Sequence, residues 1–273
     1  MSRDVPVTLE WTFAPVVALS LVAYLAVYGA RWRSVRRRHG ARAAPVWRLA
    51  AFAGGVAAVA LALLSPIDHL GEQLASAHMV QHLLLADVAA VLLILGFTKV
   101  ILRPATRRVH WLERKAGPLA HPAFGVIAYV GVMYAWHVPA LYDAALRSEL
   151  VHALEHISFA AAGFLYWWHL LSPIRSRLRL AGMGPIFYMA ATKVLVGFLG
   201  VLLAFSPERL YQGYGGDELR RWGMSPLDDQ HVAGLIMGLE QSLVMGVGLA
   251  YLFFRMLNES EQEEVRAERY GSA

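Results

Sequence analysis

Long apolar stretches separated by short polar connections dominate this chain. Stretches of about 20 residues with few charges are typical of membrane-spanning helices, whereas barrel strands are about 10 residues long and alternate in polarity. The pattern therefore predicts an all-α integral membrane protein, a seven transmembrane helix bundle forming a single transmembrane domain over residues 1–273. The predicted spans lie near residues 12–30, 46–64, 78–98, 122–137, 151–171, 185–205 and 232–254.

The basic residues predict how this bundle sits in the membrane, because cytoplasmic connections are enriched in Lys and Arg. With the N-terminus outside and the C-terminus cytoplasmic, 19 of the 25 basic residues fall on the cytoplasmic side, five fall outside, and Lys193 lies within a span. Asp4 and Glu10 precede the first apolar run and an arginine-rich segment follows it. A cleaved signal peptide has the opposite order, so we expect an uncleaved first span.

Composition narrows the classes of function. Hydrophobic residues make up 57% of the chain and charged residues 16%, whereas soluble domains are about a quarter charged. The net charge of +5 is explained by basic connections that face anionic membrane lipid, so no nucleic-acid partner is expected. Cysteine is absent, which excludes disulfides, thiolate metal sites and cysteine nucleophiles.

Two histidine pairs are the main candidates for chemistry. His78 and His82 stand four positions apart at the head of one apolar run, and His152 and His156 repeat this spacing at the head of another. Residues at this spacing lie on one face of a helix. A single histidine at a helix end is usually an interfacial hydrogen-bonding residue, but two such pairs at one depth of the membrane favour a shared metal site.

Other residues on the predicted outer side extend this candidate site. His137 ends the fourth predicted span at the level of the two pairs, and we expect it to lie beside them. For His69 and His231, a functional role and a surface role are equally supported. Carboxylates such as Glu155 and Asp229 could orient the imidazoles, as metal-bound histidines require.

The residue types bear on which metal the site would hold. Imidazole suits zinc, copper, iron and nickel, and thioether sulfur adds a preference for Cu(I). Met79, Met133 and Met237 lie in or beside the predicted site. Each methionine alone is better explained by core packing, but together they favour copper. We expect a site partly open to the outside, because a metal donor must release its ion.

Three ionisable residues fall inside predicted spans: Asp87, Lys193 and Glu240. Charged groups within a membrane are costly and are usually paired. We therefore expect an ion pair of Lys193 with Asp87 or Glu240, and a proton or ion path is the alternative.

Several motifs occur in order between about residues 76 and 240. They are His78-Met-Val-Gln-His82-Leu-Leu-Leu, Trp136-His137-Val-Pro139-Ala-Leu-Tyr142-Asp, His152-Ala-Leu-Glu155-His156-Ile-Ser-Phe, Gly200-Val-Leu-Leu-Ala-Phe-Ser-Pro207, and Asp229-Gln230 followed by Ala233-Gly234-Leu-Ile-Met237. Together they resemble the CtaG family of seven-span cytochrome c oxidase (caa-type) assembly factors. The match is more specific than one histidine pair, although the first two spans and the tail add little to it.

The resemblance implies an assembly factor in the bacterial plasma (inner) membrane that handles or delivers copper, rather than an enzyme. It implies a metal site facing the periplasm, with cytochrome c oxidase subunits and a periplasmic copper carrier as partners. In the family an uncharged residue often follows Asp-Gln, so the resemblance favours Asp229 over His231. The full set of candidate metal ligands is His78, His82, His137, His152, His156, Asp229 and His231.

Two other functions stay open on the residues alone. The segment His152-Ala-Leu-Glu155-His156 has the HxxEH pattern of a class of zinc proteases, so a membrane-embedded zinc hydrolase is one alternative. Facing histidines such as His82 and His156 could instead be the axial ligands of haem b in an electron-transfer protein. A Soret band would indicate haem, hydrolysis dependent on Glu155 would indicate the enzyme, and bound copper without a Soret band would indicate the assembly factor.

Overall fold

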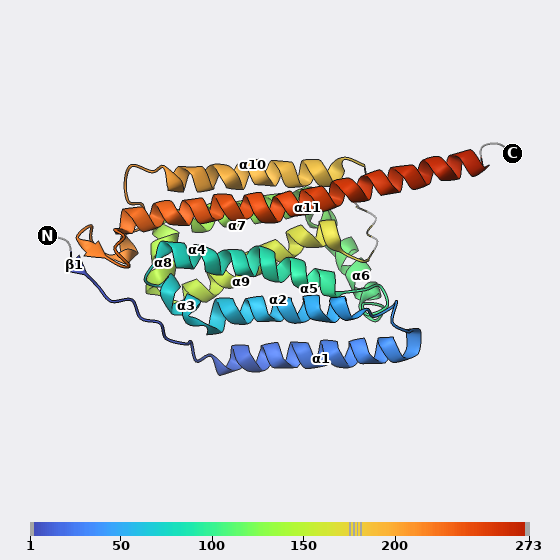
Figure 1. Ribbon diagram of the computed structural model, residues 1–273, viewed down its shortest axis with the longest axis horizontal. Coiled ribbons are helices and arrows are strands. Elements are labelled where there is room, and N and C mark those ends of the chain that lie inside the picture. The colour runs from blue at the N-terminus through green and yellow to red at the C-terminus, as the bar shows by residue number, and fades with distance from the viewer. Residues whose placement is uncertain (1–2, 175, 177, 179, 181, 271–273) are drawn as a thin grey trace.

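Helices make up most of the computed structural model, which describes residues 3–174, 176, 178, 180 and 182–270 (Figure 1). The long helices are α1 (Pro15–His39), α2 (Val46–Leu64), α7 (Pro122–Trp136), α9 (Glu149–Leu171), α10 (Gly184–Ala204) and α11 (Pro226–Tyr270). One further long stretch is made of three consecutive pieces, α4 (Ala75–Leu83), the π-helix η1 (Leu84–Ala89) and α5 (Ala90–Gly96). The short helices are α3 (Pro66–Gly71), α6 (Thr106–Ala116), η2 (Gly117–Ala120), α8 (Pro139–Arg147) and η3 (Gln212–Tyr214). Two two-residue strands, β1 (Arg3–Asp4) and β2 (Leu219–Arg220), pair in parallel.

The helices lie where the hydrophobic pattern predicted them, and each predicted span overlaps one long helical stretch. Proline helps to set their starts, because its fixed φ and missing N–H suit the first helical positions. Pro15, Pro66, Pro122, Pro139 and Pro226 open α1, α3, α7, α8 and α11. The all-α architecture is therefore confirmed.

Fewer than seven helices meet a strict length-and-composition criterion for spanning a membrane. Among the described residues, five stretches meet it, and a sixth does if Thr106–Ala120 and Pro122–Trp136, which meet at 67°, count as one bent span. Helix α9 has 23 residues, but its polar residues Glu155, His156 and His169 lower its mean hydropathy. The multi-pass character is thus supported, while seven spans and their orientation stay predictions. Three arginines of the predicted cytoplasmic set, Arg175, Arg177 and Arg179, lie outside the described residues.

The orientation can be tested with reporter fusions placed after Arg42 and at the C-terminus. Both should report the cytoplasm, because basic connections are retained on that side. A reporter signal from outside the membrane at either position would refute the predicted orientation, and with it the assignment of the histidines to the outer face.

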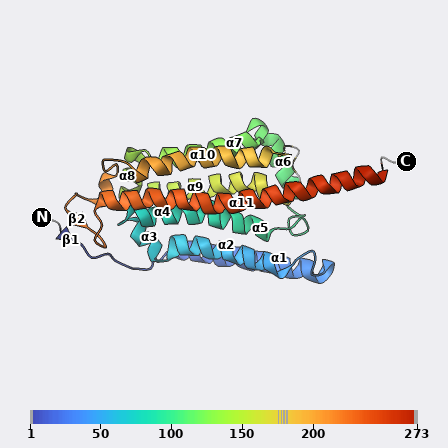
Figure 2. The same cartoon turned by 45° about the horizontal axis from the view of Figure 1, so that its top comes forward.

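Helices α4–η1–α5 and α9 form the centre of the bundle. The first stretch contacts α2, α9 and α11, so α1 and α2 lie at one edge and α10 and α11 at the other (Figures 1 and 2). Helices α4 and α9 both begin at the same end of the bundle. The residues in their first turns are therefore brought together.

A close approach of α9 to η1 fixes the middle of the bundle. Gly163 of α9 faces the backbone of Ala86, and a side chain at Gly163 would collide with the Ala86 carbonyl group. Small residues at such crossings allow membrane helices to approach closely. Asp87, the next residue in η1, accepts hydrogen bonds from the Tyr129 hydroxyl (2.6 Å) and from Trp167 Nε1 (2.8 Å).

The partners of the ionisable residues differ in part from the prediction. Asp87 is bound by two neutral donors, and Lys193 Nζ donates a hydrogen bond to Ser242 Oγ at 3.1 Å. A neutral donor binds a carboxylate without the desolvation cost of a second buried charge. The predicted pairing of Lys193 with Glu240 stays a prediction.

Candidate metal centre

Helix α4 presents His78 and His82 on one face, as their spacing predicted. The two imidazole rings lie 4.3 Å apart between centroids, and their residues are 0% and 1% exposed. The start of α4 is fixed from α11: the Asp229 carboxylate accepts hydrogen bonds from the backbone N–H groups of Ala75 and Ser76 and from the Ser76 hydroxyl. A carboxylate is favourable at this position because the N-terminus of a helix carries partial positive charge.

Helix α9 places the second pair against the first. The rings of His152 and His156 are 4.2 Å apart. His152 stacks on His78 with centroids 5.2 Å apart, and His156 meets His82 edge-on at 5.8 Å. The structure therefore brings together all four histidines that the sequence pattern paired.

Glu155 lies between the two histidines of α4. Its Oε2 is 3.4 Å from His78 Nε2, and its Oε1 is 3.4 Å from His82 Nε2. These separations exceed the roughly 2.7–2.9 Å of a charge-assisted hydrogen bond. All four atoms are buried and have no hydrogen-bond partner among the described residues.

The spacing of these atoms matches the ligands of a single ion. Ligands bound at about 2.0–2.1 Å in tetrahedral geometry are about 3.3 Å apart. The available ligand atoms of His78, His82 and Glu155 all lie within 4.8 Å of one another. The group is therefore compact enough to hold one metal ion between three side chains.

Hydrogen bonds at Nδ1 of His78 and of His137 favour the tautomer that leaves Nε2 free to bind a metal ion. Nδ1 of His78 lies 3.3 Å from the Gly71 carbonyl oxygen, and Nδ1 of His137 lies 2.6 Å from that of Met133. When Nδ1–H donates to a carbonyl, Nε2 is left with a free lone pair. Carbonyl acceptors of this kind commonly orient metal-binding histidines.

Three further imidazole nitrogens add to the supply of ligands. Nε2 of His137, of His152 and of His156 is buried without a hydrogen-bond partner among the described residues. His137 itself is 6% exposed. Five histidines thus contribute unsatisfied nitrogens to this end of the bundle.

Three tyrosines cover the centre at this end. The Tyr142 ring lies 4.9 Å from His78 and stacks on Tyr211 at 3.7 Å. Its hydroxyl is 2.8 Å from that of Tyr214, which also donates to the Gly71 carbonyl at 3.1 Å. Burial raises the pKa of Tyr142 and of Tyr214 well above the usual range, so both hydroxyls stay protonated.

This aromatic cover makes the centre more enclosed than the sequence suggested. Glu155 is 0% exposed and His156 is 9% exposed, and of the four paired histidines only His152 is half-buried. The physical reason is packing, because Tyr142, Tyr211 and Tyr214 fill the space above the rings. His152 is therefore the point at which the centre meets the surface.

Two candidate ligands occupy other positions. Both Asp229 oxygens accept hydrogen bonds from the start of α4, so this residue positions the His78–His82 pair. Nε2 of His231 is 2.8 Å from the Ser206 carbonyl oxygen. His69 Nδ1 lies 3.6 Å from Glu72 at the surface. The ring contacts that join the paired histidines include neither His69 nor His231 within the described part of the chain.

Glu155 is the residue whose place sequence reasoning underestimated. The pattern indicated it as a carboxylate that could orient an imidazole, but it is a potential ligand in its own right. The sequence does show that Glu155, one residue before His156, projects about 100° around the helix from it. That direction acquires a meaning only once α4 lies against α9. Tyr214 belongs to none of the motifs, and its role follows only from the fold.

A family model described as cytochrome c oxidase caa3 assembly factor matches residues 26–259. An uncharacterized protein of Mycobacterium leprae is 23% identical over 277 residues, covering 96% of this chain and 42% of the relative. Uncharacterized proteins of Mycobacterium bovis and Mycobacterium tuberculosis are each 26% identical over 238 residues, covering 82% of this chain and 36% of the relative. The chain thus spans about two fifths of the length of these curated relatives. No solved structure matches it.

Proposed function

Because the chain belongs to the cytochrome c oxidase caa3 assembly factor family, we propose that it helps to mature such an oxidase by binding and passing on copper. The observation that carries this proposal is the buried group of Glu155, His78 and His82, whose facing atoms accept or donate no hydrogen bond within the described part of the chain. Buried polar atoms without partners are costly. A cation held between them would satisfy all three side chains at once.

The ligand atoms of His78, His82 and Glu155 support copper as the metal that the protein binds and passes on. Imidazole and carboxylate ligands without thiolate suit copper or zinc, and copper binds such sites more strongly in the usual order of divalent metals. Met79, Met133 and Met237 are buried in the same hydrophobic core. They support the proposal by their proximity, although core packing alone explains their burial.

The second histidine pair, His152 and His156, provides a route by which the ion can be released. His152 is half-buried and stacks on His78, while its neighbour His156 meets His82. An ion could therefore exchange ligands stepwise from the Glu155 group to His152 and then to an acceptor. On this proposal the acceptors are oxidase subunits, and a periplasmic copper carrier supplies the ion.

The two alternatives receive unequal support. Glu155 Oε1 lies 3.4 Å from His82 Nε2, the atom that would have to bind haem iron, and Phe159 stacks on the His82 ring at 4.1 Å, which leaves little room for a haem macrocycle. A zinc hydrolase keeps some support, because Glu155 beside two imidazoles resembles the base of a zinc site. The Glu155-to-imidazole contacts are to α4, however, rather than within its own HxxEH segment.

Substituting Glu155 tests the proposal directly. In the purified full chain, Glu155→Gln should weaken Cu(II) binding about 10- to 100-fold, since it removes a charged ligand and keeps the side chain's shape. Competition titration with a chromophoric Cu(II) chelator measures the change, and parallel titrations with zinc and with ester or amide substrates address the hydrolase. Glu149→Gln, at an exposed position of the same helix, is the matched control. Equal copper affinities of the two variants, or turnover of substrate that depends on Glu155, would contradict the copper proposal.

A further inference from the structure

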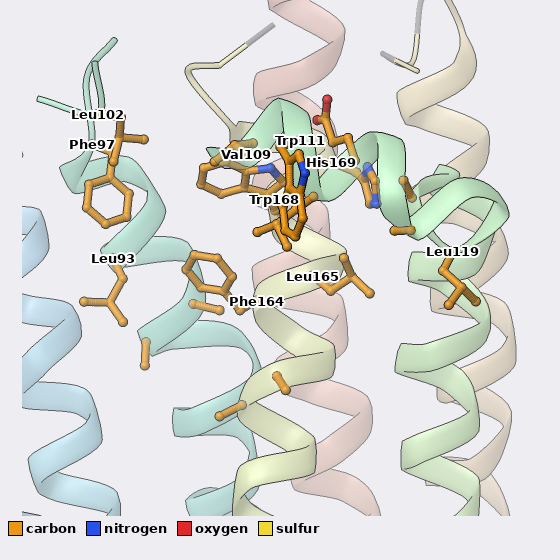
Figure 3. A pocket seen from close by; sticks show the side chains of 18 of the residues that line it. Leu93, Phe97, Leu102, Val109, Trp111, Leu119, Phe164, Leu165, Trp168 and His169 are labelled. Atoms are coloured by element: carbon orange, nitrogen blue, oxygen red, sulfur yellow. The ribbon is translucent and has the colours of Figure 1, made fainter. Parts of the chain in front are cut away.

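A large apolar groove lies at the end of the bundle opposite the His78–His82 and His152–His156 pairs. It has a volume of about 1280 Å³. Figure 3 shows four aromatic residues around the groove. Phe97 lies directly after α5, Phe164 and Trp168 lie on α9, and Trp111 lies on α6. Cavities for small molecules are usually about 300–1,000 Å³, so this groove suits a larger apolar ligand.

Small side chains line part of the groove and leave space between η1, α5 and α9. Ala89 and Ala90 contribute from η1 and α5, and Ala160 and Ala161 contribute from α9. Helix α6 covers the groove at the end of the bundle, and the α6–η2 segment makes an angle of 67° with α7. Its Trp111 and Leu112 are 52% and 56% exposed. A helix that lies across the bundle with exposed apolar side chains is typical of the membrane interface.

A polar pocket of about 420 Å³ adjoins the groove. The two spaces share Glu113, Trp168 and His169 in their walls. Arg48 and Lys99 line the polar pocket together with hydroxyl groups. The apolar and the polar space therefore adjoin at these three residues, so one amphiphile could place a different part in each.

The basic residues of the polar pocket favour an anionic head group. Arg48 donates hydrogen bonds from Nη1 to the carbonyl oxygens of Leu95 and Phe97, both at 2.7 Å. These bonds hold its guanidinium at the polar pocket with other N–H groups left to bind a ligand. Lys99 is exposed. The acidic residue of the wall, Glu113, is 3.2 Å from His110 Nδ1.

From this juxtaposition we propose that the groove and the polar pocket bind one anionic phospholipid. Its acyl chains lie along Phe97, Phe164 and Trp168, and its phosphate lies at Arg48 and Lys99. Basic pockets between membrane helices are known to bind anionic head groups. A partner helix fits less well, because its C-terminus would offer these two cations only a partial negative charge, whereas a phosphate offers a full one.

The test compares two phospholipids with identical acyl chains, phosphatidylglycerol and phosphatidylcholine, bound to the delipidated full chain. Native mass spectrometry should show preferential retention of phosphatidylglycerol. Lys99→Ala should weaken that preference about five-fold, the contribution expected of one basic residue near the membrane surface, whereas Arg42→Ala, an exposed charge outside the pocket, should not. Ala161→Trp should reduce retention of both lipids, whereas Val194→Trp, on the exposed face of α10, should retain both. Copper affinity is measured for every variant and should be unchanged, so failure of the lipid proposal is separate from failure of the copper proposal.

Any one of three results would overturn this assignment. The first is equal retention of the two lipids, and the second is an equal effect of Lys99→Ala and Arg42→Ala. The third comes from a photo-crosslinking residue placed at Ala161 in native membranes. Adducts with lipid support the proposal, and adducts with a protein in place of lipid would assign the groove to a partner helix.

Discussion

Replacing both His78 and His82 with alanine is expected to lower bound copper strongly and to leave cells with an assembled but copper-deficient, poorly active cytochrome c oxidase. These two imidazoles face Glu155 at 3.4 Å each, so the variant loses two of the three side chains that surround the proposed ion. Metal affinity depends on ligand number, so Glu155 with the remaining imidazoles of α9 should hold the ion much more weakly. Bound copper is measured by mass spectrometry of the purified protein, and oxidase activity is measured in membranes.

The matched control is the double substitution His69→Ala and His231→Ala. Both residues lie at the same end of the bundle, but His231 is bound to the Ser206 carbonyl and His69 lies beside Glu72. We expect this control to keep its copper and its oxidase activity. Thermal unfolding of both proteins separates a folding defect from loss of the ion. Copper retention by the His78/His82 variant at the level of the control would show that the proposed centre is wrong.

The second large effect is expected at Gly163, where alanine should destabilise the protein by about 3 kcal/mol, as in overpacked cores. An added Cβ would overlap the Ala86 carbonyl and lie 2.7 Å from Ala86 Cα. Backbone atoms cannot move aside as a flexible side chain can, so α9 must shift away from η1. His82 is one turn before Ala86, and Glu155 is on the shifted helix, so copper affinity should fall as well.

Gly131→Ala is the control for this substitution. A Cβ at Gly131 has nothing within 4 Å, and alanine is the better helix former. The free energy of unfolding and the copper affinity of both variants can be measured in the same detergent. Equal stability of the two variants would mean that α9 and η1 are not held at this distance in solution.

The helices and the histidine pairs could be predicted because their signals are local. Apolar runs indicate spans, and a spacing of four residues places His78 beside His82 whatever the rest of the chain does. The contact of His152 with His78 also followed, because both pairs begin their helices at the same predicted level. The place of Glu155 did not follow, because the direction in which it projects matters only once α4 lies against α9.

Other parts of the structure have no signal in the pattern. The π-helix η1 widens the turn around Asp87, and the segment Leu-Leu-Ala-Asp-Val-Ala gives no indication of it. Asp87 thereby reaches Tyr129 and Trp167, whereas charge alone suggested Lys193. The tyrosine cover joins Tyr142 to Tyr214, 72 positions later, and contacts of that range depend on the whole topology.

The hydrogen bonds of Asp229 to Ala75 and Ser76 impose an order on biosynthesis. Asp229 follows Ala75 by 154 positions. At about 5–20 residues per second, the ribosome needs roughly 8–30 s to make this stretch. Until then the start of α4 lacks its acceptor, and the His78–His82 pair lacks this support from α11. The proposed metal centre is thus completed only when α11 has been made and packed against α4, so on the copper proposal a newly made chain cannot capture copper fully before α11 is inserted.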